Sequence, residues 1–244
     1  MSQSGSHQEI GRHVEGRTSF DKELIALRRR IVREATVAID MLEAALRALW
    51  SLDDDGARRV RRRDDRVDRE EVAIETECFR LLALQQPFGG DLRQIAFCIK
   101  VNQDIERVAD HASSIAKLTA RIERPAPAWP TSLVEMGERV PMMCHSLLRA
   151  VLSEDVDAAR DVIASDKLVD RLDERLFDDV LGLLDVEPHR KSDMLLIHRI
   201  GRELERVGDL MVNIAEDVVF LVTGDIVRHE KKRKRDAEQG GASA

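Results

Sequence analysis

Apolar residues recur at intervals of three and four along almost the whole chain, which is the pattern of helices that bury one face. This spacing predicts a first helix over residues 20–49. A second helix is predicted to begin near Asp53 and to end before Pro87, and a third to cover residues 91–122. The buried positions of the first two helices are predicted to be Phe20, Leu24, Leu27, Ile31, Ile39, Leu42, Leu46 and Leu49, then Val60, Val67, Ile74 and Leu81.

A proline-rich stretch, residues 124–130, separates these helices from three further ones. The fourth helix is predicted to begin at a capping box formed by Ser132 and Glu135. Pro141 falls inside it and is expected to bend the helix or to shift its start. Thr18 or Ser19 is the predicted N-cap of the first helix.

The fifth helix is predicted to begin near Ser153, and the sixth to run from about Pro188 to Gly224, a C′ glycine. The sixth helix carries a heptad seam of apolar residues, and Glu205 and Asp209 lie away from that seam. This acid pair is therefore expected to face outward. The seam consists of Ile197, Ile200, Leu204, Val207, Met211, Ile214, Val218 and Leu221.

The second set of helices repeats the first in sequence. At an offset of about 102 residues, Leu46-Arg47-Ala48 corresponds to Leu148-Arg149-Ala150, and Asp53 corresponds to Asp155. Near the third and sixth helices the offset is about 99: residues 106–110, Glu-Arg-Val-Ala-Asp, correspond to residues 205–209, Glu-Arg-Val-Gly-Asp. We therefore predict an all-α fold, a tandem duplication of a three-helix bundle with six long antiparallel helices. The expected segments are a flexible N-terminus (1–17), a first repeat (18–123), a linker (124–131), a second repeat (132–226) and a basic flexible tail (227–244).

Acidic residues at i, i+4 spacing are repeated on corresponding helices of both halves. Such a pair lies on one face of a helix, and its like charges destabilise that helix by a few tenths of a kcal/mol, roughly. The pairs are Asp64 with Asp68, Glu106 with Asp110, Asp166 with Asp170, and Glu205 with Asp209; Glu71, Glu75 and Asp173 extend the same lines.

Two kinds of partner can offset this repulsion, and the spacing alone leaves both open. Arginines such as Arg63, Arg66 and Arg107 can form a solvated salt-bridge network on the surface. Alternatively, carboxylates of neighbouring helices converge on metal ions, for which oxygen ligation favours Fe, Mn or Mg and, less well, Zn. The sequence has no Glu-x-x-His motif, which argues against a ferritin-like redox centre.

Composition narrows the class of protein further. The net charge of −7 and only 3% aromatic residues argue against nucleic-acid binding, and no nucleotide-binding or hydrolytic motif is present. Cys78, Cys98 and Cys144 are spaced as isolated buried thiols of a reducing cytosol. The absence of a long apolar run and of a signal-peptide pattern predicts a soluble cytoplasmic protein. A basic run at residues 231–235 is interpreted as a solvated tail, with acidic lipids or an acidic partner surface as the alternative.

The chain resembles the PhoU family of phosphate-uptake regulators. The resemblance rests on Asp91-Leu92-Arg93, on residues 104–112 (Asp-Ile-Glu-Arg-Val-Ala-Asp-His-Ala), and on residues 204–209 with 213–217. It covers residues 20–229. It implies that the four acid pairs hold iron or zinc clusters on the bundle surface, and it shifts the preference from salt bridges to metal.

The resemblance also implies a function without catalysis. The expected role is a negative regulator of phosphate uptake and of the phosphate-starvation response, an adaptor between the phosphate ABC-transporter ATPase and a sensor histidine kinase. A homodimer is expected, reaching the membrane only through its partners, and the alternative function is a metal-binding or metal-storage protein. Two positions depart from the family pattern, Ala109 in place of Gly and Leu210 in place of His, so the two halves are expected to differ in metal occupancy.

Overall fold

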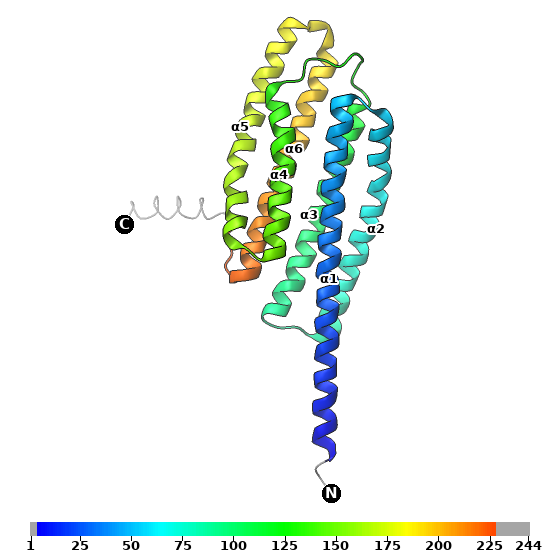
Figure 1. Cartoon of the computed structure of the whole chain (residues 1–244), viewed down its shortest axis with the longest axis vertical. Helices are drawn as coiled ribbons and strands as arrows, with labels where there is room; N and C mark the ends of the chain where they lie inside the picture. Colours follow the sequence, from blue (N-terminus) through cyan, green and yellow to red (C-terminus); the bar gives the residue numbers. More distant parts are fainter. Residues whose placement is uncertain (1–3, 228–244) are drawn as a thin grey trace, which may run out of the picture.

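The computed structural model describes residues 4–227, with side chains from residue 19 onward. Within this range the chain is helical and has no strand, which confirms the all-α prediction. Figure 1 shows the elements side by side as long rods. They are α1 (Ser4–Ser51), α2 (Asp54–Gln85), α3 (Gly90–Thr119), α4 (Thr131–Ser153), α5 (Val156–Val186), the 3-10 turn η1 (Pro188–Arg190) and α6 (Lys191–Thr223).

Two three-helix bundles lie next to each other with parallel long axes (Figure 1). Helices α1 and α3 of the first bundle contact α4 and α6 of the second, whereas α2 and α5 contact only elements of their own half. The α2–α3 turn lies at the bottom of Figure 1 and the α5–α6 turn at the top, so the halves point in opposite directions. Helices α2 and α5 therefore form the outer edges of the molecule.

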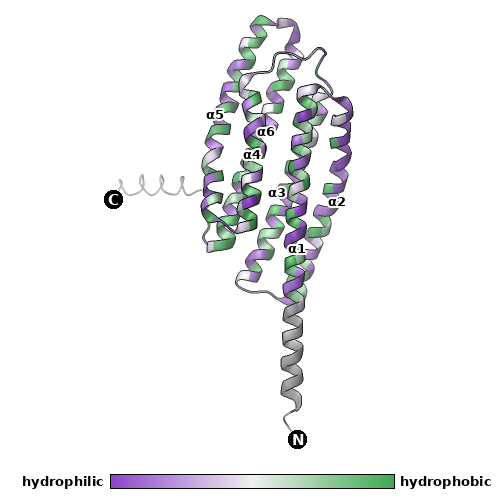
Figure 2. Cartoon of the chain, in the orientation of Figure 1, coloured by the Kyte–Doolittle hydropathy of each residue, from purple (hydrophilic) through white to green (hydrophobic). Residues whose placement is uncertain are grey.

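The predicted apolar stripes form the core. All eight positions predicted for the first helix are buried, and so are all four predicted for the second. Along α6 the seam is buried from Ile197 to Val218, and Leu221 is partly buried at its end. Hydrophilic residues dominate the outer faces, most clearly along upper α2 in Figure 2. Each helix thus buries the one face on which apolar residues recur with the helical period of about 3.6 residues, and this accounts for the packing of both bundles.

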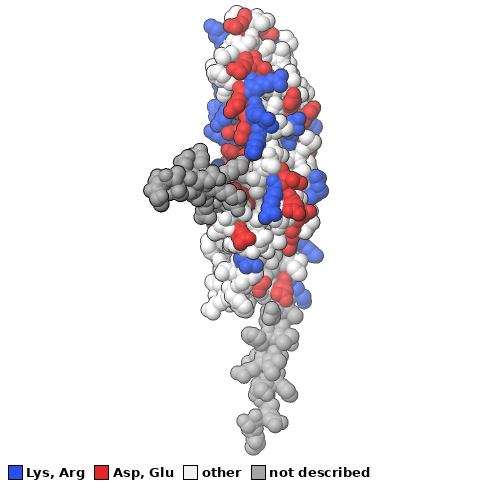
Figure 3. Space-filling model, turned by 90° about the vertical axis from the view of Figure 1, so that its left-hand side faces the viewer, with Lys and Arg blue, Asp and Glu red and all other residues white. Residues whose placement is uncertain are grey.

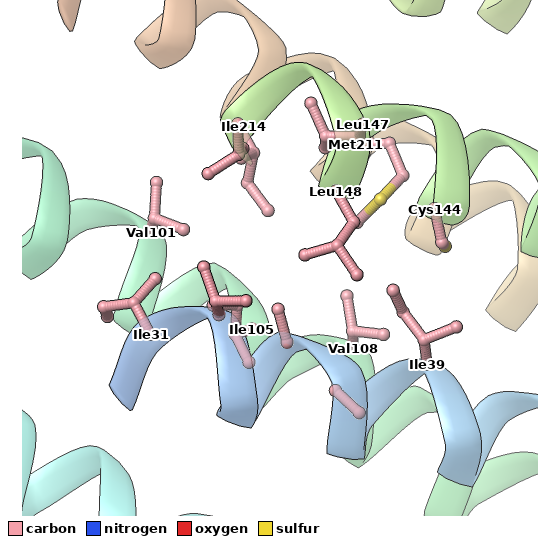
Figure 4. A pocket seen from close by; sticks show the side chains of 14 residues that line it. Ile31, Ile39, Val101, Ile105, Val108, Cys144, Leu147, Leu148, Met211 and Ile214 are labelled. Carbon is pink, nitrogen blue, oxygen red and sulfur yellow. The ribbon is translucent and has the colours of Figure 1, made fainter. Parts of the chain in front are cut away.

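A small apolar cavity of about 40 Å³ lies where the two halves meet. Figure 4 shows Ile31 and Ile39 of α1 and Ile105 of α3 facing Leu148 of α4 and Met211 of α6 across it. A space of this size with an apolar lining has no polar groups to hold water, so it is a packing defect of the interface between the halves.

Both halves make the same turn between their first two helices. Leu52 and Glu154 have positive φ angles of 49° and 53°, and the next residue in each case is the N-cap aspartate of the following helix. The Asp53 side chain accepts a hydrogen bond from the backbone N–H of Asp55, and Asp155 accepts from those of Asp157 and Ala158. The predicted start near Asp53 is confirmed, whereas Ser153 is the last residue of α4 rather than the first of α5.

Two predicted helix caps are wrong. Helix α1 continues through Thr18 and Ser19, so neither residue is a cap. Ser132 lies inside α4, whose N-cap is Pro130, and Asp179 of α5 accepts hydrogen bonds from both the backbone N–H and the hydroxyl of Ser132. A carboxylate from a neighbouring helix thus accepts from the backbone N–H of Ser132, which Glu135 was expected to do in the capping box. Pro141 lies within α4 and does not shift its start.

Other boundaries follow the sequence closely. Helix α2 ends at Gln85, two residues before Pro87, and Gly224 has a φ of 82° and donates its N–H to the carbonyl of Phe220, which confirms it as the cap of α6. Helix α1 begins at Ser4, so it extends into the segment 1–17 that was predicted as the N-terminus before the first repeat. The basic run at 231–235 lies outside the described residues.

Asp193, the third residue of α6, fixes the linker against the second bundle. Its side chain is buried, accepts a hydrogen bond from the backbone N–H of Glu123 and pairs with Arg190, which also donates to the carbonyl of Pro125. The three cysteines are buried and unpaired, as predicted. None of the helices in residues 4–227 combines the length and apolar content needed to span a bilayer.

Candidate metal centre

The eight predicted metal ligands follow one rule of placement. In each i, i+4 pair the first acid is half-buried and the second is exposed. The half-buried members lie beside the packed edge of their helix, because each precedes a buried apolar residue by two or three positions. Thus Glu205 lies deeper than the outward-facing position predicted for it, whereas Asp209 is exposed as predicted. The half-buried acids are Asp64, Glu106, Asp166 and Glu205, and the exposed ones are Asp68, Asp110, Asp170 and Asp209.

In the first half, α2 and α3 bring five carboxylates together. We call Asp64, Asp68, Glu71, Glu106 and Asp110 the first acidic cluster. Burial and then the charges of the other four members raise the pKa of Glu106 to about 7. Burial is likewise the largest cause of the raised pKa of Asp64, while Ser113 and Lys117 oppose the shift. In the described structure the Oδ1 atom of Asp64 is buried without a hydrogen-bond partner. The cluster therefore brings negative charges close together and has one buried oxygen without a hydrogen-bond partner.

In the second half, α5 and α6 form the equivalent arrangement. We call Asp166, Asp170, Asp173, Glu205 and Asp209 the second acidic cluster. Burial is the largest cause of the raised pKa of Glu205, Asp209 adds to it, and Arg202 opposes it. The guanidinium of Arg202 bridges the two helices, with Nη1 2.8 Å from Oδ2 of Asp173 and 3.3 Å from Oε1 of Glu205. Figure 3, which faces the α5 side of the molecule, shows basic side chains beside acidic ones.

Gly208 and Ala109 occupy equivalent positions at the centres of the two clusters, and unequal metal occupancy stays a prediction. A Cβ atom at Gly208 would lie 3.3 Å from Oδ1 of Asp166 and 3.5 Å from Cγ1 of Val169. Helix α6 therefore approaches α5 closely at this point. Ala109 is the equivalent residue in the first half and is buried against its neighbours.

His111 pairs with Glu203, a residue that the sequence analysis did not single out. Its Nδ1 atom lies 2.7 Å from Oε2 of Glu203, which is buried at the contact between α3 and α6. The position equivalent to His111 is Leu210, which is buried in the core. An acid three residues from Ile200 on the buried side of α6 was the signal available in the sequence. The other histidines are ordinary: His145 pairs with Glu43, and His198 lies edge-on to Phe177.

Carboxylate oxygens are the ligands that hard cations prefer, and the crowded charges of the first cluster fit a cation in chemical type. In residues 19–227, no three Asp, Glu, His or Cys side chains are already arranged around a common metal position. Binding would therefore require side-chain rotation, which the exposed acids Asp68 and Asp110 can make. If metals bind, Asp64, Asp68, Glu106 and Asp110 would hold them in the first half, and Asp166, Asp170, Glu205 and Asp209 in the second.

The salt-bridge alternative holds for part of this surface. Arg202 neutralises two members of the second cluster, and Arg30 pairs with Glu70 at 2.8 Å on the other side of α2. Arg107, which the sequence analysis named, pairs with Asp104 at 3.6 Å rather than with an acid of the cluster. Arg171 on α5 donates to the backbone carbonyl of Lys167.

Comparisons of the sequence and of the structure with known proteins point to the same family. The model of the PhoU domain matches residues 31–119 and 133–218, one match on each side of the linker. A protein of Deinococcus radiodurans, named phosphate-specific transport system accessory protein PhoU homolog, is 37% identical over 166 residues, which are 68% of this chain and 78% of the relative.

Two crystal structures share the fold over nearly their whole length. PhoU from Pseudomonas aeruginosa has a TM-score of 0.81 and 33% identity, covering 84% of this chain and 100% of that one. The phosphate transport system regulatory protein PhoU from Streptococcus pneumoniae has a TM-score of 0.80 and 29% identity, covering 85% of this chain and 99% of that one.

Proposed function

Because this chain belongs to the PhoU family, we propose that it is an accessory regulator of a phosphate-specific transport system. The observation that carries the proposal is the match of both halves to the PhoU domain, together with the similarity to two PhoU crystal structures over more than four-fifths of the chain. One of those proteins is titled a regulatory protein of phosphate transport and the Deinococcus relative an accessory protein.

More specifically, the proposed role is negative regulation without catalysis. The protein would restrain phosphate uptake and the phosphate-starvation response as an adaptor in the cytoplasm, between the ATPase of the ABC transporter and a sensor histidine kinase. Long helices support this role because they offer extended faces to partner domains. Outer helices α2 and α5 expose apolar residues in both halves, among them Val72 and Phe79 on α2 and Phe177 and Leu181 on α5.

Gene deletion tests the regulatory role. The deletion strain should accumulate phosphate and express the starvation response in phosphate-rich medium, and the wild-type gene should restore both. An unchanged phosphate response would refute the proposal. A pull-down from phosphate-replete cells should recover the transporter ATPase and the kinase, and Phe79→Asp on the exposed face of α2 should reduce recovery while helix content stays unchanged.

We propose also that the acidic clusters bind iron or zinc, with manganese or magnesium as alternatives. When bound, such an ion would supply positive charge that offsets the repulsion between carboxylates of adjacent helices. Elemental analysis of the purified protein tests this. Replacing Glu106 and Asp110 with Gln and Asn should lower the metal content while the protein stays folded.

A metal-storage protein is the second candidate, favoured by the unused oxygen of Asp64 and the crowded charges around Glu106. The two candidates differ in what loss of metal does. If storage is the function, metal-site variants should change the metal content of cells and leave phosphate uptake normal.

The proposed assembly is a homodimer. Light scattering with size-exclusion chromatography measures it directly, and a mass of one chain at micromolar concentration would contradict it.

A further inference from the structure

Besides Ala109 and Gly208, the two acidic clusters differ in the charge of one residue that precedes the glutamate of each cluster. The offset of about 99 residues that relates Glu106 to Glu205 also relates Gln103 to Arg202. Each of these residues lies three positions before the half-buried glutamate of its cluster, so it lies on the same side of the helix. The first half therefore has a neutral amide where the second half has a guanidinium.

Arg202 is placed as a counterion of the second cluster. It lies 2.8 Å from the carboxylate of Asp173 on α5 and 3.3 Å from that of Glu205 on α6. The hydrogen bond to Asp173 is the largest cause of its raised pKa, and the charges of Glu205 and Asp209 add to it. A single side chain thus takes up part of the negative charge that α5 and α6 bring together.

The first cluster has no cation in direct contact with its acids in the described residues; Lys117 acts on Asp64 only through its charge, which opposes the raised pKa of that acid. Every one of the main influences on Glu106 raises its pKa, namely burial and the four neighbouring carboxylates. Gln103 is exposed and uncharged, and in the part of the chain that the structure describes no lysine or arginine forms an ion pair with Glu106 or Asp110. The two clusters therefore have matching carboxylates, but only the second has a cation in contact with two of its acids.

We propose that Arg202 is a built-in counter-cation that occupies the second acidic cluster, so that divalent cations load the first cluster in preference to the second. This inference rests on the proposed metal binding. It adds that the two clusters differ in affinity for cations, although their acidic residues match. A bound divalent ion at the second cluster must displace Arg202 from Asp173 and Glu205 or bind beside its positive charge. At the first cluster no arginine has to be displaced, because Lys117 forms no ion pair with its acids in the described residues.

The proposed charge difference resides in the pair Gln103 and Arg202, so it can be exchanged between the halves without changing Ala109 or Gly208. Arg202→Gln gives the second cluster the residue of the first, and Gln103→Arg gives the first cluster the residue of the second. Arg202→Lys is the matched control, because it keeps the positive charge and removes the planar guanidinium.

The experiment is a titration of the chelator-stripped full-length protein with Zn²⁺ and, separately, Mn²⁺. Affinity is read by calorimetry, and the cluster that binds is identified from the loss of binding in Glu106→Gln and in Glu205→Gln. In the wild-type background, Glu106→Gln should remove the tightest binding and Glu205→Gln should leave it unchanged. Arg202→Gln should create a second tight component, at least about tenfold stronger than the wild-type second cluster, because a nearby positive charge has been removed.

The reciprocal change should have the opposite effect. Gln103→Arg should weaken the first cluster by about tenfold or more, and Arg202→Lys should retain the wild-type binding pattern. Circular dichroism checks that each variant has the wild-type helix content. If Arg202→Gln does not fold, Gln103→Arg and Arg202→Lys still test the inference.

Three results would overturn it. Equal loss of binding in Glu106→Gln and Glu205→Gln would show that the clusters load equally. An unchanged second cluster in Arg202→Gln would show that Arg202 has only a structural role; in both cases metal binding itself would stand. No cation binding to the wild type or to Arg202→Gln would refute the proposed metal function and the inference together.

Discussion

Nδ1 of His111 lies 2.7 Å from Oε2 of Glu203, and this contact joins α3 of the first half to α6 of the second. The two side chains are only 13% and 6% exposed, so water screens the pair poorly. Leu210 stands at the position equivalent to His111, so the duplication does not repeat this imidazole. Helices α3 and α6 are joined by a second, different polar contact, the ion pair between Lys100 and Asp217 at 3.1 Å.

We expect Glu203→Gln to lower the free energy of unfolding by about 1–3 kcal/mol, because it removes the charge that His111 faces in a buried site. Urea denaturation at neutral pH measures the change. The control is Glu43→Gln, since Glu43 also lies 2.7 Å from a histidine, His145, but in an exposed pair. It should cost less than about 1 kcal/mol. Equal losses in the two variants would contradict the importance of burial.

Glu203 should also make the free energy of unfolding depend on pH in the acidic range. Burial works to raise the pKa of Glu203, but the hydrogen bond and charge of His111, with Arg206 and Arg199, outweigh it and lower the pKa. Its stabilising contribution is thus present above the unfolded pKa of about 4.3 and is lost as pH falls through the lower native pKa. Urea midpoints should decline more steeply in this acidic range for the wild type than for Glu203→Gln.

Glu106 should produce the opposite pH dependence in the metal-free protein. Its pKa is raised to about 7, first by burial and then by the neighbouring carboxylates, so the native state binds the proton more tightly than the unfolded state. The resulting stabilisation is complete below the unfolded pKa of about 4.3 and is lost as pH rises through about 7. With a chelator present, Glu106→Gln should remove this decline and be more stable than the wild type in mildly alkaline buffer. A decline of the same size in the variant would disprove the assignment to Glu106.

Gly201 of α6 tests the close packing of the second bundle. A Cβ atom there would lie 2.0 Å from Cδ2 of Leu176, which is fully buried. Gly201→Ala should therefore destabilise the protein by about 1–3 kcal/mol through overpacking. Gly182→Ala in α5 is the control: nothing lies within 4 Å of its Cβ position, and the substitution should stabilise the helix by about 0.5–1 kcal/mol. Thermal unfolding of both variants gives the comparison.

The three cysteines should be unreactive in the native protein. Burial raises the pKa of each of the thiols of Cys78, Cys98 and Cys144 to about 12, so the reactive thiolate is scarce and shielded. A coloured disulfide reagent at neutral pH should label none of them within the time that it labels all three in urea. Rapid labelling of the folded protein would show that the core opens at these sites.

The duplication made much of the fold predictable. Asp53 and Asp155 correspond in the sequence and prove to be the N-caps of equivalent helices, and Gly224 proves to cap α6. These features depend on a few neighbouring residues of the chain, which the sequence displays directly. Ser132 also looked like a cap, but its partner is Asp179 from another helix, and no local pattern contains that information.

The sequence alone determined the six helices, their buried faces and the repeated acid pairs, because a period of 3.6 residues acts within a single helix. The tertiary structure decided which of those acids lie deep, that Arg202 joins α5 to α6, and that His111 meets Glu203 rather than the acidic cluster beside it. Each of these outcomes depends on which helix packs alongside and at what height, because charge and burial act through space between segments far apart in the chain.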